Sequence, residues 1–397
     1  MTASTEERSG AGGPALATVQ FVFTLGWTAY VVMLPGLLDQ AGIALRWLPV
    51  ILLIDQAIFI AMDIAFGTLA DRMREVYRSL ARLLLVLTSV SALAFLLLPM
   101  AAGVSPGALL LVLLLWVVSA SVVRVPTLIL LAKRARAAQR PGLVIWYTAG
   151  MGLAMALSPF LGLWLRGANP QLPFVVSAVL LLATVLMLLR VSAVDGAGEE
   201  ETEAPAPVPF VTCLPLLAAL TVAGTGFQLH AFVNAAPLYQ VHASQEALPW
   251  LMPLLWTGFF AMLVGVGALV KRFGAMPIAA AGLLLAAASS YLAASAGSLN
   301  VLVAWQVLCG AGWAMAFAGL MEQMSNAGTR GAEGLFMGSF FAMTAVSAVF
   351  RIAFAAYWLA DWQDSRFVLP AILLLAAGAI AAFDARKWAE IRTPKSP

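Results

Sequence analysis

One stretch decides the fold of this chain: Asp63-Ile-Ala-Phe-Gly67-Thr-Leu-Ala-Asp71-Arg72-Met-Arg74. It begins inside a long apolar run and ends in a cluster of arginines. A glycine stands four residues before an Asp-Arg pair, where the apolar run meets its first basic residues. We interpret the stretch as the end of a hydrophobic helix that leaves a lipid bilayer.

The composition supports a membrane setting for the whole chain. Its 397 residues are 62% hydrophobic and 10% charged, whereas a soluble domain has about 45–50% apolar and about 25% charged residues. Such a chain cannot cover itself with a water-facing surface, so we predict an integral protein of the lipid bilayer. Cys213 and Cys309 lie inside apolar runs and are interpreted as small buried side chains.

The apolar residues fall into twelve runs with charges, prolines or glycines between them. A helix needs about 20 apolar residues to cross a bilayer, and these runs are too long and too continuous for barrel strands of about 10 residues. We therefore predict an all-α membrane protein with twelve transmembrane helices. The runs are 15–38, 47–69, 82–102, 107–132, 142–165, 173–191, 210–239, 247–270, 276–296, 299–321, 334–359 and 366–383.

Lysine and arginine set the predicted orientation, because cytoplasmic loops carry the excess of basic residues. With the N-terminus inside, seventeen of the 22 basic residues fall in cytoplasmic segments and three on the opposite side. Both termini are therefore predicted to be cytoplasmic, in a multi-pass protein of the inner (cytoplasmic) cell membrane. The net charge of +3 follows from this topology and does not indicate nucleic-acid binding.

The longest predicted loop divides the chain six helices plus six. It is acidic and rich in proline and alanine, which predicts a disordered linker. The predicted parts are an N-terminal tail (1–14), a six-helix bundle (15–191), the cytoplasmic linker (192–209), a second six-helix bundle (210–385) and a C-terminal tail (386–397).

An internal repeat supports this division. The motif that follows the second run returns after the eighth run as Gly267-Ala-Leu-Val-Lys271-Arg272, with glycine and arginine at the same spacing. Two related six-helix halves are typical of many secondary transporters, which bind their substrate between the halves.

The first copy, Gly67-x-Leu-Ala-Asp71-Arg72-x-Arg74, resembles the loop 2–3 signature of the major facilitator superfamily, and Gly267 to Gly274 resembles its weaker copy. The resemblance implies that Asp71, just past the end of helix 2, caps a neighbouring helix of the other half. It also implies that Arg72 and Arg74 hold the loop against nearby helix ends and that Gly67 lets two backbones approach closely. Together these residues would form a latch on the inner side.

Two further resemblances bear on the direction of transport. The segment from Gly150 to Gly162 resembles the helix 5 motif of the superfamily's antiporters, although small residues also serve ordinary helix packing. The stretch from Asp63 to Arg72 also resembles the end of helix 2 in cation-coupled sugar symporters. Ile64 stands there in place of the expected proline, and Phe59 in place of a second aspartate.

Charges within predicted helices are costly in lipid and indicate a partner, a water-filled cavity or a function. At about 1.5 Å per residue, Asp55 on helix 2 and Arg351 on helix 11 each lie about 12 Å from the outer face. In the superfamily's fold these two helices face each other across the halves. We therefore hypothesise an Asp55–Arg351 ion pair that closes an outer gate. The alternative is that each charge lies separately in the aqueous cavity or pairs within its own half.

Asp63 and Arg124 lie at similar depths from the inner face and belong to the same half. An ion pair within that half is expected, either as static scaffolding or as part of a proton relay. Desolvation favours the neutral form of a carboxylic acid, so a carboxylate that loses its basic partner during transport can take up a proton.

Candidates for the substrate cavity are the polar and aromatic side chains deep in the helices. Helix 7 carries Gln228, His230 and Asn234, which either form a substrate or proton site or serve as packing groups with hydrogen bonds. The sequence has no second ligand at metal-binding spacing beside His230, so we expect no metal site. The aromatic candidates are Trp27, Tyr30 and Trp313.

The expected function is secondary active transport of a small organic molecule by alternating access, as proton-coupled efflux by a monomer. The alternatives are an importer or cation symporter of a polar solute such as a sugar, and a non-transporting relative that acts as a sensor or assembly factor. No enzyme motif, phosphate-binding loop or cofactor motif is found in the sequence.

Overall fold

The computed structural model describes residues 12–72, 77–132, 140–165, 169–194, 208–328 and 332–392. All regular structure in these residues is helical, with no strand among them. Twelve of the helical stretches are long and apolar enough to cross a membrane. This confirms the predicted all-α membrane protein with twelve spans.

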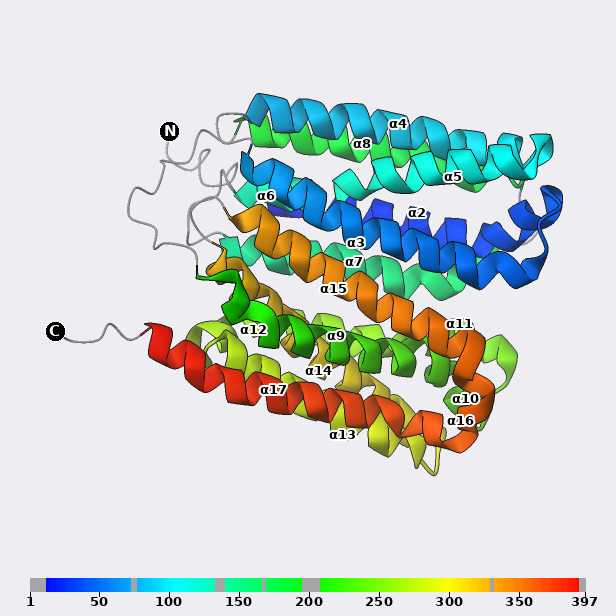
Figure 1. Ribbon diagram of the computed structural model, residues 1–397. Helices are drawn as coiled ribbons and strands as arrows, with labels where there is room; N and C mark the ends of the chain where they lie inside the picture. The colour runs from blue at the N-terminus through cyan, green and yellow to red at the C-terminus, as the bar shows by residue number, and fades with distance from the viewer. Residues whose placement is uncertain are drawn as a thin grey trace, which may run out of the picture. The chain divides into compact units, whose positions relative to one another are not determined.

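The helices fall into two compact units (Figure 1). Unit 1 comprises Met1–Ala206 together with Arg330–Ala342. Within it α2 packs against α7 and α8, and α4 packs against α5 and α8. Its elements are α2 (Gly12–Gln40), η1 (Leu45–Trp47), α3 (Leu48–Arg72), α4 (Tyr77–Val104), α5 (Pro106–Ala120), η2 (Ser121–Val123), α6 (Val125–Ala132), α7 (Arg140–Trp164) and α8 (Leu172–Val194).

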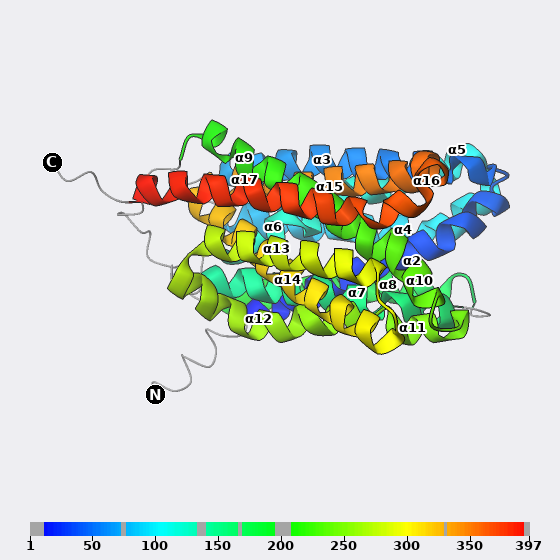
Figure 2. The same cartoon turned by 90° about the horizontal axis from the view of Figure 1, so that it is seen from below.

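Unit 2 comprises Pro207–Thr329 and Met343–Pro397. Its helix α13 packs against α14 and α17, as Figure 2 shows, and α17 packs against α9. Its elements are η4 (Phe210–Cys213), α9 (Leu214–Gln228), η5 (Leu229–Asn234), α10 (Ala235–Gln240), η6 (Gln245–Ala247), α11 (Leu248–Leu251), α12 (Leu254–Phe273), α13 (Ala275–Ala294), α14 (Leu299–Ala327), η7 (Phe354–Trp358), α16 (Leu359–Trp362), η8 (Gln363–Phe367) and α17 (Leu369–Arg392).

One helix contributes to both units. α15 (Glu333–Ala353) clusters with unit 1 up to Ala342 and with unit 2 from Met343 onward. Two of the named segments, η5 and η7, are π-helices, in which the helical turn is wider than in an α-helix. Both π-helices therefore interrupt longer α-helical spans, and η7 follows directly after α15.

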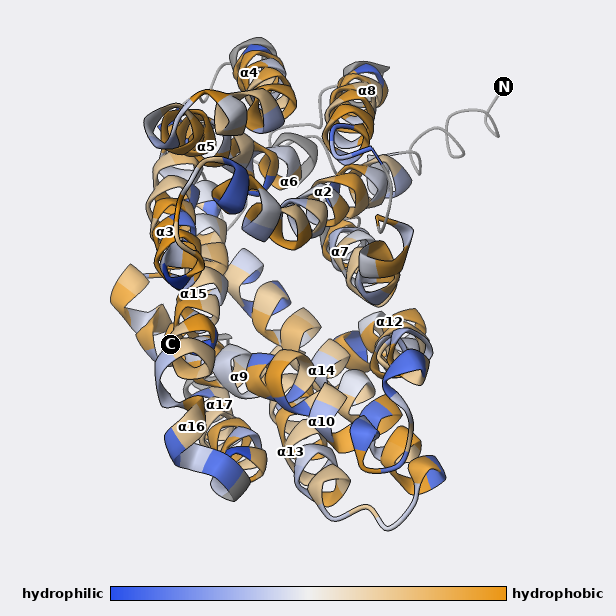
Figure 3. Ribbon diagram, turned by 90° about the vertical axis from the view of Figure 1, so that its right-hand side faces the viewer, coloured by the Kyte–Doolittle hydropathy of each residue, from blue (hydrophilic) through white to orange (hydrophobic). Residues whose placement is uncertain are grey.

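Burial follows the pattern of a protein surrounded by lipid. Large apolar side chains such as Leu111, Val264 and Phe383 are 68%, 92% and 81% exposed, while the carboxylates of Asp55 and Asp63 lie buried. Figure 3 shows the same distribution, with hydrophobic colour along the helices and hydrophilic colour at end segments such as α16. A surface that faces lipid needs no charged side chains. The charged side chains that lie buried between the helices therefore require a separate explanation.

Local sequence accounts for the helix ends. Ser105 caps α5, because its hydroxyl accepts a hydrogen bond from the Ala108 amide at 3.1 Å and Pro106 follows at the first helical position. Gly274 ends α12 with a positive φ of 89°, which only glycine adopts at little cost. The start of α5 and the end of α12 therefore each lie within one residue of the side chain or glycine that caps them.

Some boundaries lie outside the apolar runs. α2 begins at Gly12, inside the predicted N-terminal tail (1–14), and α8 ends at Val194, inside the predicted linker (192–209). α17 continues to Arg392, well into the predicted C-terminal tail (386–397). Hydropathy marks only the lipid-covered part of a helix, and alanine, lysine and glutamate continue a helix well in water. Residues 1–11, 195–207 and 393–397 lie outside the described residues.

Candidate functional site

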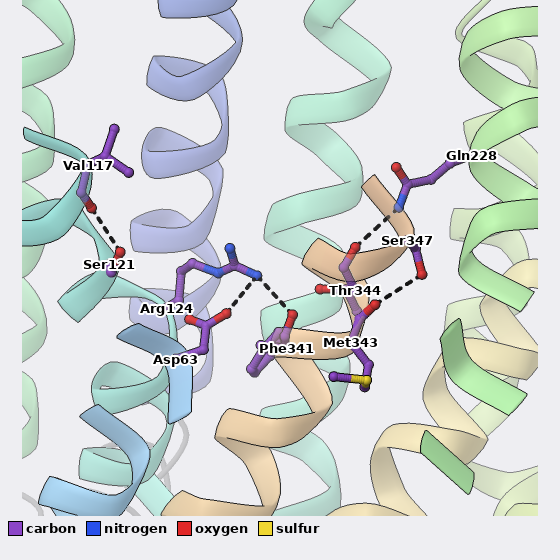
Figure 4. Close-up of polar contacts among 9 residues, drawn as sticks. All are labelled: Asp63, Val117, Ser121, Arg124, Gln228, Phe341, Met343, Thr344 and Ser347. Carbon is purple, nitrogen blue, oxygen red and sulfur yellow. Dashed lines mark hydrogen bonds and ion pairs between the residues drawn. The ribbon is translucent and has the colours of Figure 1, made fainter. Parts of the chain in front are cut away.

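The site begins at a break in the fourth span. The predicted helix over 107–132 is divided into α5, the 3-10 segment η2 and α6. Pro126 lacks an amide hydrogen and so removes one backbone hydrogen bond at this point. Ser121 donates its hydroxyl hydrogen to the Val117 carbonyl at 2.8 Å (Figure 4). Arg124 stands at the junction of these segments.

Gln20 of α2 compensates for this break. Its side-chain amide donates to the Val123 carbonyl at 2.9 Å and lies 3.2 Å from the Thr127 hydroxyl oxygen, and the side chain is 1% exposed. The polar groups left by the irregular backbone are thereby satisfied inside unit 1. Gln20 was not among the predicted site residues, although a single amide side chain in an otherwise apolar run was a usable signal.

The charged centre of unit 1 is an ion pair between α3 and this junction. The Arg124 Nη2 atom lies 3.2 Å from Asp63 Oδ2, and the two side chains are 13% and 0% exposed (Figure 4). The predicted contact between Asp63 and Arg124 is confirmed, while its role stays a prediction. Neither Asp63 oxygen accepts a hydrogen bond from the described residues. A buried carboxylate without hydrogen bonds depends on its counter-ion to remain charged.

Arg124 also contacts α15. Its Nη2 atom donates to the Phe341 carbonyl at 3.4 Å, and its guanidinium lies 4.7 Å from the Phe59 ring centre and 5.9 Å from that of Phe341. Tyr147 of α7 packs against Phe341 with ring centres 5.0 Å apart. The cation is thus held between aromatic faces and touches the backbone of α15.

Asp71 binds the first turn of the same helix. Its two carboxylate oxygens accept hydrogen bonds from the Gly334 amide at 2.7 Å and the Leu335 amide at 2.8 Å. These amides have no partner within α15, and the positive end of a helix favours a carboxylate. The cap implied by the family resemblance is present. The prediction that Asp71 lies just past the end of helix 2 was wrong, because α3 continues to Arg72 and its last turn carries the carboxylate to α15.

The glycine of the opening motif allows α3 and α15 to touch. A Cβ atom at Gly67 would overlap the Gly334 carbonyl, and one at Gly338 would overlap the Asp63 carbonyl. The backbones therefore meet between the ion pair and the cap, as the resemblance implied for Gly67.

The remaining motif residues make fewer contacts. Arg72 is exposed and has no ion pair or hydrogen bond with the described residues, and Arg74 lies outside them. In the second copy, Gly267 is half-buried, and the exposed Arg272 lies 5.1 Å from the ring centre of the adjacent Phe273. Of the residues implied for an inner latch, Asp71 and Gly67 thus contact α15, while the latch itself stays a prediction.

The two charges proposed for an outer gate each have a partner within their own unit. In unit 1, the buried Tyr30 donates its hydroxyl hydrogen to Asp55 Oδ2 at 2.9 Å. In unit 2, Arg351 Nε donates to Gln228 Oε1 at 2.9 Å. The cross-half pair of Asp55 with Arg351 stays a prediction.

The aromatic candidates pack mainly against other rings. Trp27 stacks on Trp116 with ring centres 5.5 Å apart, and Tyr30 lies against both rings. A cavity of about 20 Å³ beside Trp27 is bordered by Ser91, whose enclosed hydroxyl has no partner among the described residues. This space suits a single water molecule. In unit 2, Trp313 is 6% exposed and stacks on a phenylalanine ring of α9.

The helix 7 candidates lie at the π-helix η5. His230 is 1% exposed, and its Nε2 atom lies 3.0 Å from Gln306 Oε1, a residue that the sequence analysis missed. Asn234 donates to the Arg366 carbonyl at 2.8 Å, while its own side-chain oxygen is enclosed and has no partner in the described part of the chain. Among the described residues, no three His, Cys, Asp or Glu side chains gather at a possible metal site.

Comparison with known proteins completes the description. The family model described as Major Facilitator Superfamily matches residues 16–350. Two solved structures of a bacterial homologue of the iron transporter ferroportin, both outward-facing and one with soaked iron, have 16% sequence identity to this chain. Their TM-scores are 0.66 and 0.67, and the matches cover 96% and 95% of this chain and 99% of each of those chains. A comparison with curated proteins gave no match.

Proposed function

Because this chain belongs to the Major Facilitator Superfamily and is a membrane transporter rather than an enzyme, we propose that it exports a small organic solute in exchange for protons. Transport proceeds by alternating access, in which a central site opens to one side of the membrane at a time. The protein works as a monomer in the cytoplasmic membrane with both termini inside the cell.

The observation that carries the proton coupling is the Asp63–Arg124 ion pair. The carboxylate is fully buried, is 3.2 Å from one cation and accepts no hydrogen bond from the described residues. Its negative charge is therefore stabilised almost entirely by Arg124. A proton can replace that cation, since protonation removes the charge that burial disfavours.

Exchange between the proton and Arg124 has a structural consequence for α15. Arg124 also touches the Phe341 carbonyl, and Asp71 on the same helix as Asp63 caps the start of α15. When Asp63 is protonated, its charge no longer attracts Arg124. The contacts that Arg124 makes with α3 and α15 then weaken. The proton thereby changes how firmly α15 is bound, which couples protonation to the opening of the carrier.

The direction of transport rests on the antiporter-like segment from Gly150 to Gly162. A Cβ atom at Gly150 would overlap the backbone of Ala17 on α2. Flux into and out of liposomes measures the direction directly.

The test uses purified protein in liposomes with the pH dye pyranine inside. Thermal shift against organic acids, amines and sugars first identifies a ligand, and the liposomes are then loaded with it. An antiporter moves protons inward as the ligand leaves, so an acidic exterior speeds efflux and acidifies the interior. Asp63→Asn is expected to abolish this dependence on pH while ligand exchange without a gradient continues.

The matched control is Asp361→Asn, which neutralises an exposed carboxylate on α16 and should leave the pH dependence unchanged. Protons and ligand moving in the same direction would replace antiport by symport, and stimulation by sodium would favour the cation symporter. Flux that ignores the pH gradient in the unmodified protein would refute proton coupling.

A further inference from the structure

Arg351 is a membrane-embedded cation whose partner is neutral. It lies on α15 within a span of unit 2 and is half-buried. Its Nε atom donates to the Gln228 side-chain oxygen at 2.9 Å, and no described carboxylate of unit 2 lies within ion-pair distance. An arginine in a membrane span requires compensation, and an amide oxygen supplies only part of it.

The position of that hydrogen bond determines what else Arg351 can bind. Only the Nε edge of the guanidinium faces Gln228, whereas the two terminal nitrogens donate to no described residue. Gln228 is itself fixed, because its amide donates to the Thr344 carbonyl at 3.4 Å (Figure 4). A guanidinium held at one edge presents two parallel N–H groups at the other, and this fork matches a carboxylate.

Apolar surface lies beside the fork. The guanidinium is 5.4 Å from the ring centre of Phe232, which is 44% exposed, and the neighbouring Phe350 is 48% exposed. An aromatic face stabilises the cation without neutralising it. A ligand that supplied both a negative charge and an apolar body would contact the fork and the Phe232 ring together.

The backbone around this pair is irregular. Gln228 directly precedes the π-helix η5, and Arg351 precedes the π-helix η7 by three residues. These are both of the π-helical segments in the described part of the chain. π-Helical turns occur frequently at functional sites, so their position supports a binding role independently of the charge.

We propose that Arg351 and Gln228 bind the carboxylate of an organic acid that has an apolar body. This inference rests on the proposed transport function and specifies the class of its solute. The carboxylate binds end-on to the two terminal nitrogens of Arg351, Gln228 orients the guanidinium, and Phe232 contacts the apolar body.

The test measures ligand binding by the full chain in lipid nanodiscs, through thermal shift and tryptophan fluorescence. The probes are benzoate, 2-naphthoate and octanoate, each compared with its alcohol and its amine at equal ionic strength, and with chloride alone. Carboxylates should bind in preference to alcohols, amines and chloride. Arg351→Gln should weaken carboxylate binding about 10- to 100-fold, the usual loss for a hydrogen bond to a charged group. Arg351→Lys keeps the charge without the fork and should retain part of the affinity.

The matched control is Arg272→Gln, which removes an exposed arginine that also lies over a phenylalanine ring in unit 2. Its affinity should equal that of the unmodified protein. Circular dichroism verifies that each variant is folded.

The inference is overturned if no carboxylate binds, if chloride binds equally well, or if Arg351→Gln binds carboxylates normally. Pyranine liposomes separate the two proposals: carboxylate binding without any flux refutes transport alone, and proton-coupled flux of a neutral solute refutes this inference alone.

Discussion

Asp63 and Arg124 stabilise each other in a place where neither charge is favourable alone. The carboxylate is fully buried and the guanidinium nearly so. Taking two charges out of water consumes most of the energy that their attraction provides, so the pair contributes little net stability. Removing one partner is different, because the other charge then remains buried without compensation. The pair is therefore suited to a switch that depends on the presence of both charges.

We predict that Asp63→Asn and Arg124→Gln each lower the free energy of unfolding by about 3–5 kcal/mol, and that the double variant loses less than the sum. The loss in Arg124→Gln should shrink as the pH falls and grow as it rises, because protonation removes the isolated charge of Asp63. The loss in Asp63→Asn should not show this dependence on pH, because the asparagine side chain does not titrate.

Thermal unfolding of the four proteins in one detergent, at acidic and mildly alkaline pH, measures these differences. Additive losses in the double variant at both pH values would show that the two side chains do not act as a pair.

At the scale of elements, α3 holds the start of α15 through its backbone and its last turn. Gly67 brings the two helices into backbone contact, and Asp71 accepts hydrogen bonds from two amides of the first turn of α15. The cap satisfies donors that a helix cannot satisfy itself. Asp63 lies on the same helix as this cap, so the proposed protonation of Asp63 would act on the helix that holds the start of α15.

We predict that Asp71→Ala destabilises the first turn of α15 by about 0.5–2 kcal/mol, the usual cost of losing a capping side chain. Hydrogen exchange should become faster at the Gly334 and Leu335 amides and remain unchanged in α5. Ser105→Ala is the matched control, because Ser105 caps α5 and its loss should have the opposite distribution. Unaltered exchange in α15 would contradict the cap.

At the scale of the whole molecule, the distribution of basic residues predicts which helix ends face the cytoplasm. Lysine and arginine are retained on the inner side during insertion. The segment between α2 and α3 should therefore lie outside the cell and the segment between α12 and α13 inside it.

This topology is tested in a background without the two buried cysteines, made by Cys213→Ser and Cys309→Ser. Single Leu45→Cys and Phe273→Cys variants place a thiol at positions that are 56% and 53% exposed. A membrane-impermeant maleimide should label the Leu45→Cys variant in intact cells and the Phe273→Cys variant only after permeabilisation. The reverse pattern would overturn the predicted orientation.

The sequence by itself determined the class, the twelve spans and the family of this protein. Most backbone hydrogen bonds of a span are made within it, so a run of apolar residues is sufficient to define it. The depth of a charge follows from its position in the run, which is why the contact between Asp63 and Arg124 was predictable. The Gly67 and Asp71 motif was recognisable because its spacing is local.

Only the tertiary structure decided which side chains meet, because rotation about a helix axis and the neighbours of each helix are not encoded locally. It gave Asp55 a tyrosine partner and Arg351 a glutamine. It also placed Asp71 in the last turn of α3 rather than just past its end, where the carboxylate reaches the first turn of α15. Such partners depend on how separate helices pack, and packing is a property of the folded chain rather than of any one segment.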